Sequence, residues 1–346
     1  MLVLERLAYP AHKLCGEFLS VEVAAMFARL GVLGAVEAAG AVALRRSRVT
    51  AETGESFDMP LPGTALGLSR YRLDALLMEA VRTAGGDARD ASPVRGVEGS
   101  WEDGFTVAFG GRGAEHTVRA RAVVGAFGKR SGLDGKLNRD FLRHRTPYVG
   151  LKAHFEGDDL EDVIELHAFR GGYCGLSHVE DGLVNGCWIA READLKAAGS
   201  PERMLETTLR RNPHLADRLD RLRRVTPFQA VSQVTFRLKG KFDGGLAMVG
   251  DTAGMIAPLC GDGMAMALRG AELLAPRLAA LLDGRTTRPA FEADYAHAWD
   301  GQFGLRLGLG RTLHALYTRP AVASAALRLC THAPSVGRWI ARHTRG

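Results

Sequence analysis

One stretch of sequence decides the fold: Leu246-Ala247-Met248-Val249-Gly250-Asp251-Thr252-Ala253-Gly254, continued by Pro258-Leu259-Cys260-Gly261-Asp262-Gly263-Met264. Its apolar start predicts a buried strand, and the pattern over residues 265–282 predicts a long helix. A glycine-rich loop with an aspartate at the carboxyl end of the strand therefore joins the two. Such a loop offers backbone N–H groups and a helix N-terminus to an anionic or polar ligand. Because ligands of open α/β sheets lie at the carboxyl ends of the strands, we expect a binding site here.

The composition excludes several classes of protein. The chain has 346 residues, 46% hydrophobic and 24% charged, which is typical of a globular protein. Its net charge is +6, but the sequence contains no block of like charges, so we predict no nucleic-acid partner. The five cysteines include no C-x-x-C pair, which favours a reducing, cytoplasmic location and argues against a metal site or a disulfide framework. No run of apolar residues is long enough to predict a spanning helix, and no signal peptide is visible.

The start of the chain carries a second landmark. Leu2-Val3-Leu4 is a predicted parallel strand, and it is followed by an acid, Glu5. Taken alone, Glu5 is typical of an ordinary acid at a strand end. A G-x-G-x-x-G fingerprint, which binds a pyrophosphate in a βαβ unit, is absent from the sequence. Further along, Ser20 is predicted to cap a helix that ends at Gly31, and Ser69-Arg70 is predicted to open another.

The pattern changes between residues 147 and 240. Strand-like stretches surround a helical patch at 201–222, which predicts an antiparallel sheet with its own helices. We therefore predict a discontinuous first domain at 1–146 and 241–284, an inserted second domain at 147–240, and C-terminal helices at 285–346. These helices interleave arginines with apolar residues and are predicted to cover the sheet. Peripheral contact with a membrane surface is the alternative.

Four features, taken in this order, resemble FAD-dependent oxidoreductases of the p-hydroxybenzoate hydroxylase superfamily, in the geranylgeranyl-reductase-like branch. They are Glu5 after its strand, the segment Lys13-Leu14-Cys15-Gly16, Arg70 with Asp74, and the Gly-Asp loop. The resemblance covers about residues 1–284. It implies the α/β class, with a Rossmann-like FAD-binding domain whose first β-strand and helix are missing, an inserted antiparallel-sheet substrate domain and a helical C-terminus.

The resemblance implies roles for residues at the adenosine end of FAD. Glu5 would bind the ribose, Val94 would give backbone contacts near the adenine, and Arg70 would face the flavin or its diphosphate. Glu5 and Asp251 are expected on the same sheet edge, at the two ends of one cofactor.

The resemblance also implies roles at the flavin end. Asp251 would hydrogen-bond the ribityl chain. The residues implied to line the flavin are Lys13, Cys15 and Gly16 on one side, and Pro258, Gly261, Gly263 and Met264 beside the isoalloxazine. Glycine permits this close backbone approach, and the helix N-terminus at Gly263 would stabilise negative charge near N1 of the reduced ring.

Two departures from the family matter. The absent G-x-G-x-x-G segment supplies the diphosphate cradle, so we expect either a start about 30 residues upstream or a real truncation. Phe127-Gly128 stands where many aromatic hydroxylases carry Asp-Gly. This second departure counts against direct use of NAD(P)H and against a simple aromatic hydroxylase.

The resulting hypothesis is an FAD-dependent oxidoreductase that acts on an apolar small molecule beneath the second domain. NAD(P)H or another donor would supply electrons, and the flavin would transfer hydride to a double bond or carry out monooxygenation. The alternative is a truncated, non-catalytic flavoprotein remnant that binds an apolar ligand without FAD. The sequence assigns no catalytic residue.

Overall fold

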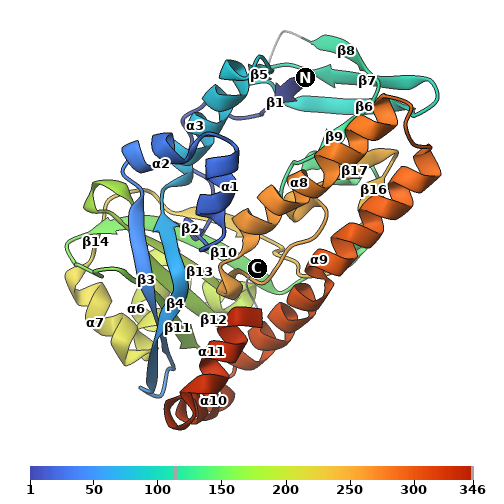
Figure 1. The fold of residues 1–346 in the computed structure, drawn as a ribbon. Helices are drawn as coiled ribbons and strands as arrows, with labels where there is room; N and C mark the ends of the chain where they lie inside the picture. Colours follow the sequence, from blue (N-terminus) through green and yellow to red (C-terminus); the bar gives the residue numbers. More distant parts are fainter. Residues whose placement is uncertain (112–114, 344–346) are drawn as a thin grey trace.

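A computed structural model describes residues 1–111 and 115–343. The predicted α/β class, antiparallel sheet and helical C-terminus are confirmed, as Figure 1 shows. The predicted domain boundaries stay a prediction, and the last three residues of the C-terminal segment lie outside the described residues.

Two small separate sheets each contain one parallel pair of strands. β1 (Leu2–Leu4) pairs with β5 (Asp87–Arg89), and β9 (Val124–Gly125) pairs with β17 (Leu246–Met248), which also contacts β16 (Phe242–Asp243). Within the described residues, no backbone pairing joins these two sheets. Glu5 and Asp251 therefore follow strands of different sheets. The expectation that both acids lie on one continuous sheet edge is wrong at the level of backbone pairing, because no strand connects β1 to β9.

A large curved sheet forms the second layer, in the order β14-β10-β13-β12-β11-β3-β4-β2, with β15 also paired to β10. Its strands are β2 (Phe18–Leu19), β3 (Val42–Thr50), β4 (Ser56–Gly67), β10 (Tyr148–Glu156), β11 (Val163–Phe169), β12 (Gly172–His178), β13 (Val184–Arg191), β14 (Arg223–Arg224) and β15 (Gln229–Ser232). Neighbours run antiparallel except β11 and β3. Strands from before residue 147 thus share a sheet with the predicted insertion. Of residues 226–236, only Gln229–Ser232 form a strand, β15.

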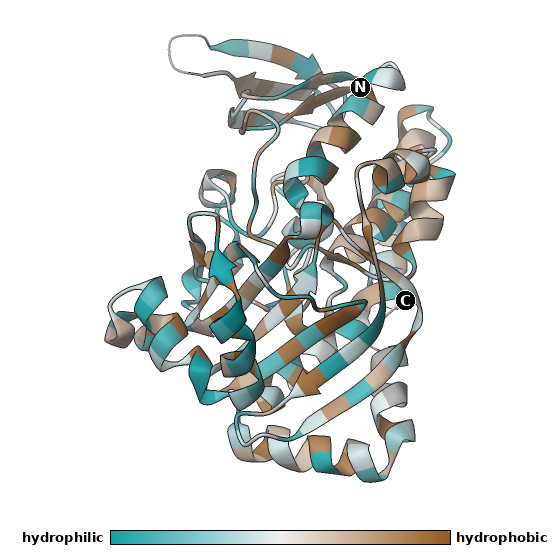
Figure 2. Cartoon of the chain, turned by 90° about the vertical axis from the view of Figure 1, so that its left-hand side faces the viewer, coloured by the Kyte–Doolittle hydropathy of each residue, from teal (hydrophilic) through white to brown (hydrophobic). Residues whose placement is uncertain are grey.

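The two faces of β10 have different partners. Val149, Leu151, Ala153 and Phe155 are buried in one apolar cluster with residues of the helical segment at 192–221. Figure 2 shows hydrophobic and hydrophilic residues alternating along strands of this sheet. The helices of that segment are α5 (Glu192–Ala198), α6 (Pro201–Thr207), η3 (Leu209–Arg211) and α7 (Pro213–Arg221). Because side chains alternate along a strand, the even-numbered residues of β10 point to the opposite face.

The N-terminal part of the chain contains three helices, α1 (Val23–Arg29), α2 (Leu33–Ala38) and α3 (Arg70–Thr83). A separate three-stranded sheet consists of β6 (Val94–Ser100), β7 (Gly104–Phe109) and β8 (His116–Ala120). Ser69 caps α3, as predicted, because its side chain accepts a hydrogen bond from Arg72 N. Ser20 does not cap α1; the N-cap is Glu22, and the Ser20 hydroxyl is engaged elsewhere. A short helix, α4 (Gly132–Lys136), and two 3₁₀ turns, η1 (Asp140–Arg143) and η2 (Glu180–Gly182), complete the elements before and within the large sheet.

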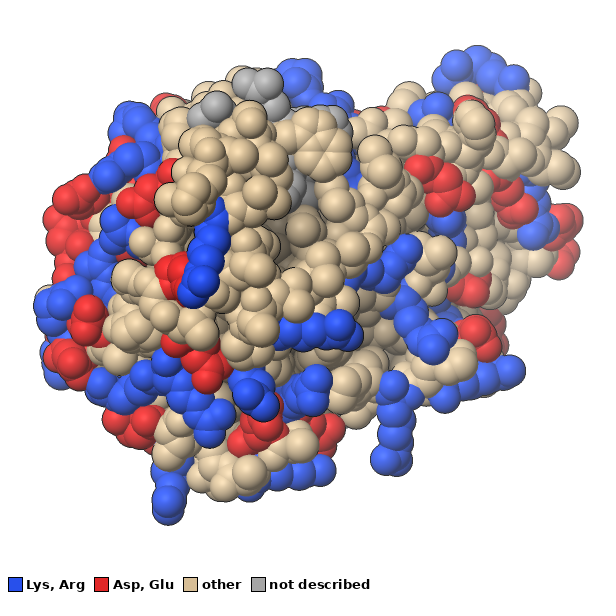
Figure 3. All heavy atoms as spheres, turned by 90° about the horizontal axis from the view of Figure 1, so that it is seen from below, with Lys and Arg blue, Asp and Glu red and all other residues tan. Residues whose placement is uncertain are grey.

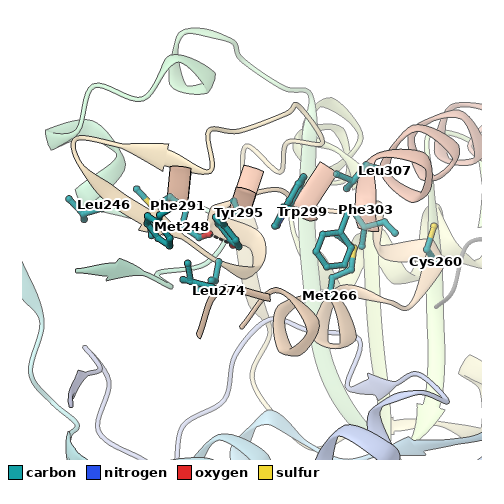
Figure 4. Packing of buried hydrophobic residues seen from close by; sticks show 14 of the residues in the cluster. Leu246, Met248, Cys260, Met266, Leu274, Phe291, Tyr295, Trp299, Phe303 and Leu307 are labelled. Carbon is teal, nitrogen blue, oxygen red and sulfur yellow. Dashed lines mark hydrogen bonds between the residues drawn. The ribbon is translucent and has the colours of Figure 1, made fainter. Parts of the chain in front are cut away.

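Two long helices hold β17 in place. α8 (Gly263–Leu282) and α9 (Arg288–Tyr317) lie side by side, and α10 (Pro320–His332) and α11 (Pro334–His343) follow. Figure 4 shows aromatic residues of α9, including Tyr295 and Trp299, packed on β17 and α8. The Tyr295 hydroxyl donates to the backbone oxygen of Met248 at 2.7 Å. Among the described helices, none has the length and apolar character needed to cross a membrane.

Candidate functional site

The loop after β17 needs its glycines. Gly250 opens the turn η4 (Gly250–Thr252), and Gly261 follows the turn η5 (Pro258–Cys260). Gly261 has φ of 69°, in the left-handed region, and a Cβ there would lie 2.9 Å from the ring of Phe18. The backbone can take this path only where no side chain is present.

The N-terminus of α8 is open towards the loop. Asp262 is the N-cap, but its carboxylate does not cap the helix. It accepts instead from the Ser20 hydroxyl at 3.0 Å and from Arg306 at 3.0 Å. Burial, and then the charge of Glu22, raise the pKa of Asp262. The first N–H groups of the helix are therefore uncapped and available to an acceptor.

Asp251 has a fixed backbone and a free carboxylate. Lys239 Nζ donates to the backbone oxygens of Asp251 at 2.7 Å and of Lys129 at 2.8 Å. Burial lowers the pKa of Lys239 to about 8. The next residue, Thr252, accepts through its hydroxyl from Gly128 N at 2.8 Å. Among the described residues, none donates a hydrogen bond to the Asp251 carboxylate, so it can accept from a ligand.

Side chains from other parts of the chain donate hydrogen bonds to the backbone oxygens of the segment Lys13–Gly16. Lys152 Nζ donates to Lys13 O at 3.2 Å, and Lys129 Nζ donates to Leu14 O at 2.8 Å. Asn185 Nδ2 donates to Gly16 O at 2.8 Å and to Cys15 O at 3.4 Å. Two of these donors lie on β10 and β13. The large sheet thus fixes the backbone of a segment predicted to line the flavin.

A buried ion-pair cluster anchors the end of this segment. Glu17 is fully buried and pairs with Lys152 and with His154 Nε2, the latter at 2.7 Å. Burial works to raise the pKa of Glu17, but the hydrogen bond to His154 and the charge of Lys152 hold it below its usual value. His12, Glu17 and His154 place ligand atoms within 4.8 Å of one another. The Lys152 ammonium already pairs with the Glu17 carboxylate. We therefore interpret these side chains as an ion-pair network rather than a metal centre.

At the other end, Glu5 is engaged by its own chain. One carboxylate oxygen accepts from Leu7 N at 3.0 Å, and the other accepts from Tyr9 Oη at 2.9 Å and Lys13 Nζ at 2.7 Å. Burial works to raise the pKa of Glu5, but the hydrogen bonds to Lys13 and Leu7 outweigh it and lower the pKa.

Arg70 belongs to the same network. Its guanidinium forms two hydrogen bonds to the Asp74 carboxylate, at 2.5 and 2.7 Å, and Lys13 Nζ lies 3.0 Å from the same carboxylate. Burial opposes the charge on Arg70, but Asp74 and the nearby Cys15 raise its pKa. Val94 begins β6, two residues after Ser92, whose N–H donates to Glu5 O at 2.7 Å.

The predicted residues thus form two groups. Glu5, Lys13, Arg70 and Val94 gather at one end, and Asp251 with the four residues of 258–264 gathers at the other. Cys15 belongs next to the first group, because its side chain interacts with Arg70, and the backbone oxygen of its neighbour Leu14 accepts from Lys129. The sequence analysis missed the residues that hold the loops: Lys129, Lys152, Asn185, Lys239 and Glu17. No local motif marks these residues, because their partners are backbone oxygens or buried charges far away in the sequence.

Comparisons with known proteins show the family and the fold. Residues 1–296 match the family model described as the FAD binding domain. The chain is similar to digeranylgeranylglycerophospholipid reductase 2 of Methanopyrus kandleri, with 23% identity over 280 residues, 76% of this chain and 67% of the relative.

Solved structures share the fold. The flavin-dependent brominase Bmp2 superposes with a TM-score of 0.82 at 16% identity, over 99% of this chain and 86% of the brominase. The p-nitrophenol 4-monooxygenase PnpA of Pseudomonas putida DLL-E4 superposes with a TM-score of 0.77 at 18% identity, over 96% of this chain and 87% of that enzyme. The resemblance inferred from the sequence is confirmed.

Proposed function

Since the chain belongs to the FAD binding domain family, we propose that it is an FAD-dependent oxidoreductase that converts a small, mainly apolar molecule. Its relatives include a reductase, a brominase and a monooxygenase. The substrate would lie between the loop at 256–264 and the second-domain sheet.

One observation supports this proposal above the others: the Asp251 end offers both kinds of group that a flavin with its ribityl chain needs. The free Asp251 carboxylate can accept from hydroxyl groups, and the uncapped N–H groups of α8 can donate to an electron-rich ring edge. When bound, FAD would supply the redox chemistry, either hydride transfer or monooxygenation.

The chain's own residues would bind and orient the cofactor. Asp251 would hold the ribityl chain, and Gly261 and Gly263 would let the backbone approach the ring. Lys152 and Asn185 would keep the Lys13–Gly16 segment rigid, because they fix its carbonyl oxygens from the second domain. The roles of Glu5 and Val94 at the adenosine end, and of Arg70 at the flavin or its diphosphate, stay predictions.

The electron donor and the partners are also proposals. NAD(P)H or another reductant would supply the electrons, and a cytoplasmic location suits the five free cysteines. Peripheral membrane contact through the C-terminal helices at 285–346 stays a prediction; Leu329 and Trp339 are exposed there. Figure 3 shows basic and acidic side chains intermixed around a mainly uncharged area on the underside of the molecule.

The first test is a titration of the purified chain with FAD, followed by optical spectroscopy. A flavin band that stays with the protein after gel filtration supports the proposal, and a colourless protein after incubation with excess FAD contradicts it. NADPH oxidation and O₂ consumption, measured together, separate a reductase from a monooxygenase. A reductase oxidises NADPH in step with substrate and without O₂ uptake.

The alternative, a non-catalytic remnant that binds an apolar ligand without FAD, is less well supported. Its strongest support is the Glu5 end, where the carboxylate is satisfied internally and β1 is not paired to β9 in the described chain. Against it, the Asp251 end retains a free carboxylate, two positive-φ glycines and an uncapped helix N-terminus.

A further inference from the structure

The aspartate that precedes α8 does not cap the helix. Aspartate is among the best N-cap residues, because its carboxylate accepts a hydrogen bond from the second or third N–H group of a helix. Asp262 occupies the N-cap position, but its backbone has φ of −113° and ψ of 3° instead of the extended conformation of a capping residue, and its carboxylate forms no capping bond. A residue suited to capping is therefore held in a different conformation at the helix end where we expect the flavin.

Two residues from distant parts of the chain hold the Asp262 carboxylate. The Ser20 hydroxyl, before α1, donates to one carboxylate oxygen, and the Arg306 guanidinium, on α9, donates to the other, both at 3.0 Å. Asp262 and Ser20 are buried, and the Arg306 side chain is mostly buried. Because each oxygen has its own donor outside α8, the carboxylate is directed away from the first N–H groups of the helix.

The backbone on either side of Asp262 leaves the residue able to turn. Both neighbours are glycines: Gly261 has φ of 69°, and an added Cβ at Gly263 would meet no atom within 4 Å. A residue between two glycines can change its backbone conformation at little steric cost. The conformation of Asp262 therefore depends on its hydrogen bonds with Ser20 and Arg306.

Arg306 also lies near a second carboxylate. Its guanidinium is 3.6 Å from Glu22 Oε1, which has no hydrogen-bond partner among the described residues. Burial and then the charge of Glu22 raise the pKa of Asp262 to about 7, and Arg306 works against both. Without Arg306, the two carboxylates would lose the cation between them, and the positive end of the α8 dipole would attract Asp262.

We propose that Ser20 and Arg306 are positioning residues for FAD: they hold the Asp262 carboxylate away from α8 and so keep the first N–H groups of the helix available to the cofactor. A carboxylate at the cap would accept from these N–H groups itself and would place negative charge beside an electron-rich ring edge. Arg306 lies beyond residues 1–296, which match the family, so α9 would contribute to the cofactor site. This inference rests on the proposed function.

The test measures the affinity for FAD at about pH 8.5, above the pKa of Asp262. Arg306→Met should weaken binding by about tenfold, on the scale of one capping interaction, whereas Arg306→Lys, which keeps the charge, should stay within about threefold of the wild type. Adding Asp262→Ala to Arg306→Met should restore the affinity to within about threefold of the wild type, because alanine has no carboxylate to cap the helix.

Two further variants control for stability. Arg277→Met removes another ion pair between α8 and α9, that of Arg277 with Asp294 at 2.9 Å, far from the helix N-terminus. It should leave the affinity for FAD within about twofold of the wild type. Ser20→Ala is a milder change than Arg306→Met, since it removes one uncharged donor. It should weaken FAD binding by about threefold, and Asp262→Ala should restore this loss as well.

A readout without FAD separates capping from a general loss of structure. In Arg306→Met, hydrogen exchange of the peptide that contains Met264 and Ala265 should slow by about threefold or more, since a capping carboxylate would protect their N–H groups. Equal or faster exchange, unchanged affinity for FAD in Arg306→Met, or a loss of affinity that Asp262→Ala does not restore overturns the inference. A wild type that binds no FAD, with exchange that still slows in Arg306→Met, contradicts the proposed function and not the role of Arg306 at the cap.

Discussion

The two acids that follow parallel strands, Glu5 and Asp251, differ in what surrounds them. Glu5 has both carboxylate oxygens satisfied by Leu7, Tyr9 and Lys13. Asp251 has its backbone oxygen fixed by Lys239, and no described residue bonds its carboxylate. The same local pattern, a short apolar strand followed by an acid, thus has two outcomes. The Glu5 carboxylate is fully hydrogen-bonded within the chain, which we call the closed end, and the Asp251 carboxylate is available to a ligand, which we call the open end.

The difference teaches that an acid at a strand end is not a binding group by position alone. Neighbouring donors decide whether it stabilises the folded chain or stays available to a ligand. At the Glu5 end, Lys13 and Arg70 bring two cations to two carboxylates and leave little unpaired charge. At the Asp251 end, Lys239 donates to backbone oxygens and glycines form the turns, so no described residue donates to the carboxylate.

Among the substitutions, the largest loss of stability is expected in the buried cluster around Glu17. Lys152→Met removes the ammonium group from the buried Glu17 carboxylate, which then keeps only its hydrogen bonds with His154 Nε2 and Arg70 N. We expect the free energy of unfolding to fall by about 3–5 kcal/mol, because a buried charge loses its counter-ion. Urea denaturation measures this change.

The matched control for that substitution is Lys196→Met. Lys196 pairs with Glu192 on the surface of α5, where its side chain is 75% exposed. A surface pair of this kind contributes less than about 1 kcal/mol. Equal losses in the two variants would show that the Glu17 cluster does not hold the Lys13–Gly16 segment.

A smaller effect should distinguish two glycines of the open end. Gly261→Ala places a Cβ in the left-handed region and against Phe18, so we expect a loss of stability of roughly 1–2 kcal/mol. Gly263→Ala meets no atom within 4 Å and starts a helix, so it should be neutral or slightly stabilising. Thermal unfolding without FAD is the measurement. Equal values for both variants would mean that the loop is not held in this conformation.

The smallest effect should be a pH dependence at the closed end. The pKa of Glu5 is lowered in the folded chain, so its contribution to stability is present above the unfolded value of 4.5 and is lost as pH falls below it. Glu5→Gln should lower the free energy of unfolding at pH 7 by about 1 kcal/mol and reduce the acid-induced loss between pH 5 and 3. An unchanged pH profile would place Glu5 outside the Lys13 network.

Much of this arrangement could be predicted from the sequence. The strand before Gly250, the glycines of the loop and the helix from Gly263 follow from periodicity and turn chemistry, which are local. The cap of α3 at Ser69 follows in the same way.

What could not be predicted depends on contacts between distant residues. Ser20 satisfies the criteria for a helix cap, yet its hydroxyl bonds Asp262, 242 positions away. Lys152 and Asn185 reach the Lys13–Gly16 segment because of the register in which β10 pairs with β13 and the face of the sheet on which each residue lies. The sequence pattern of a single strand specifies neither. The separation of β1 from β9 is likewise a property of strand pairing and not of either strand's sequence.

The most direct test of the account is the affinity for FAD of Asp251→Ala compared with that of Glu5→Gln, measured by calorimetric titration against the wild type. The account predicts that Asp251→Ala weakens binding by about 1.5–3 kcal/mol, the loss of a charge-assisted hydrogen bond, which is roughly 10- to 150-fold in Kd. Glu5→Gln should weaken it by less. Unchanged affinity in Asp251→Ala would contradict the assignment of the open end as the flavin site.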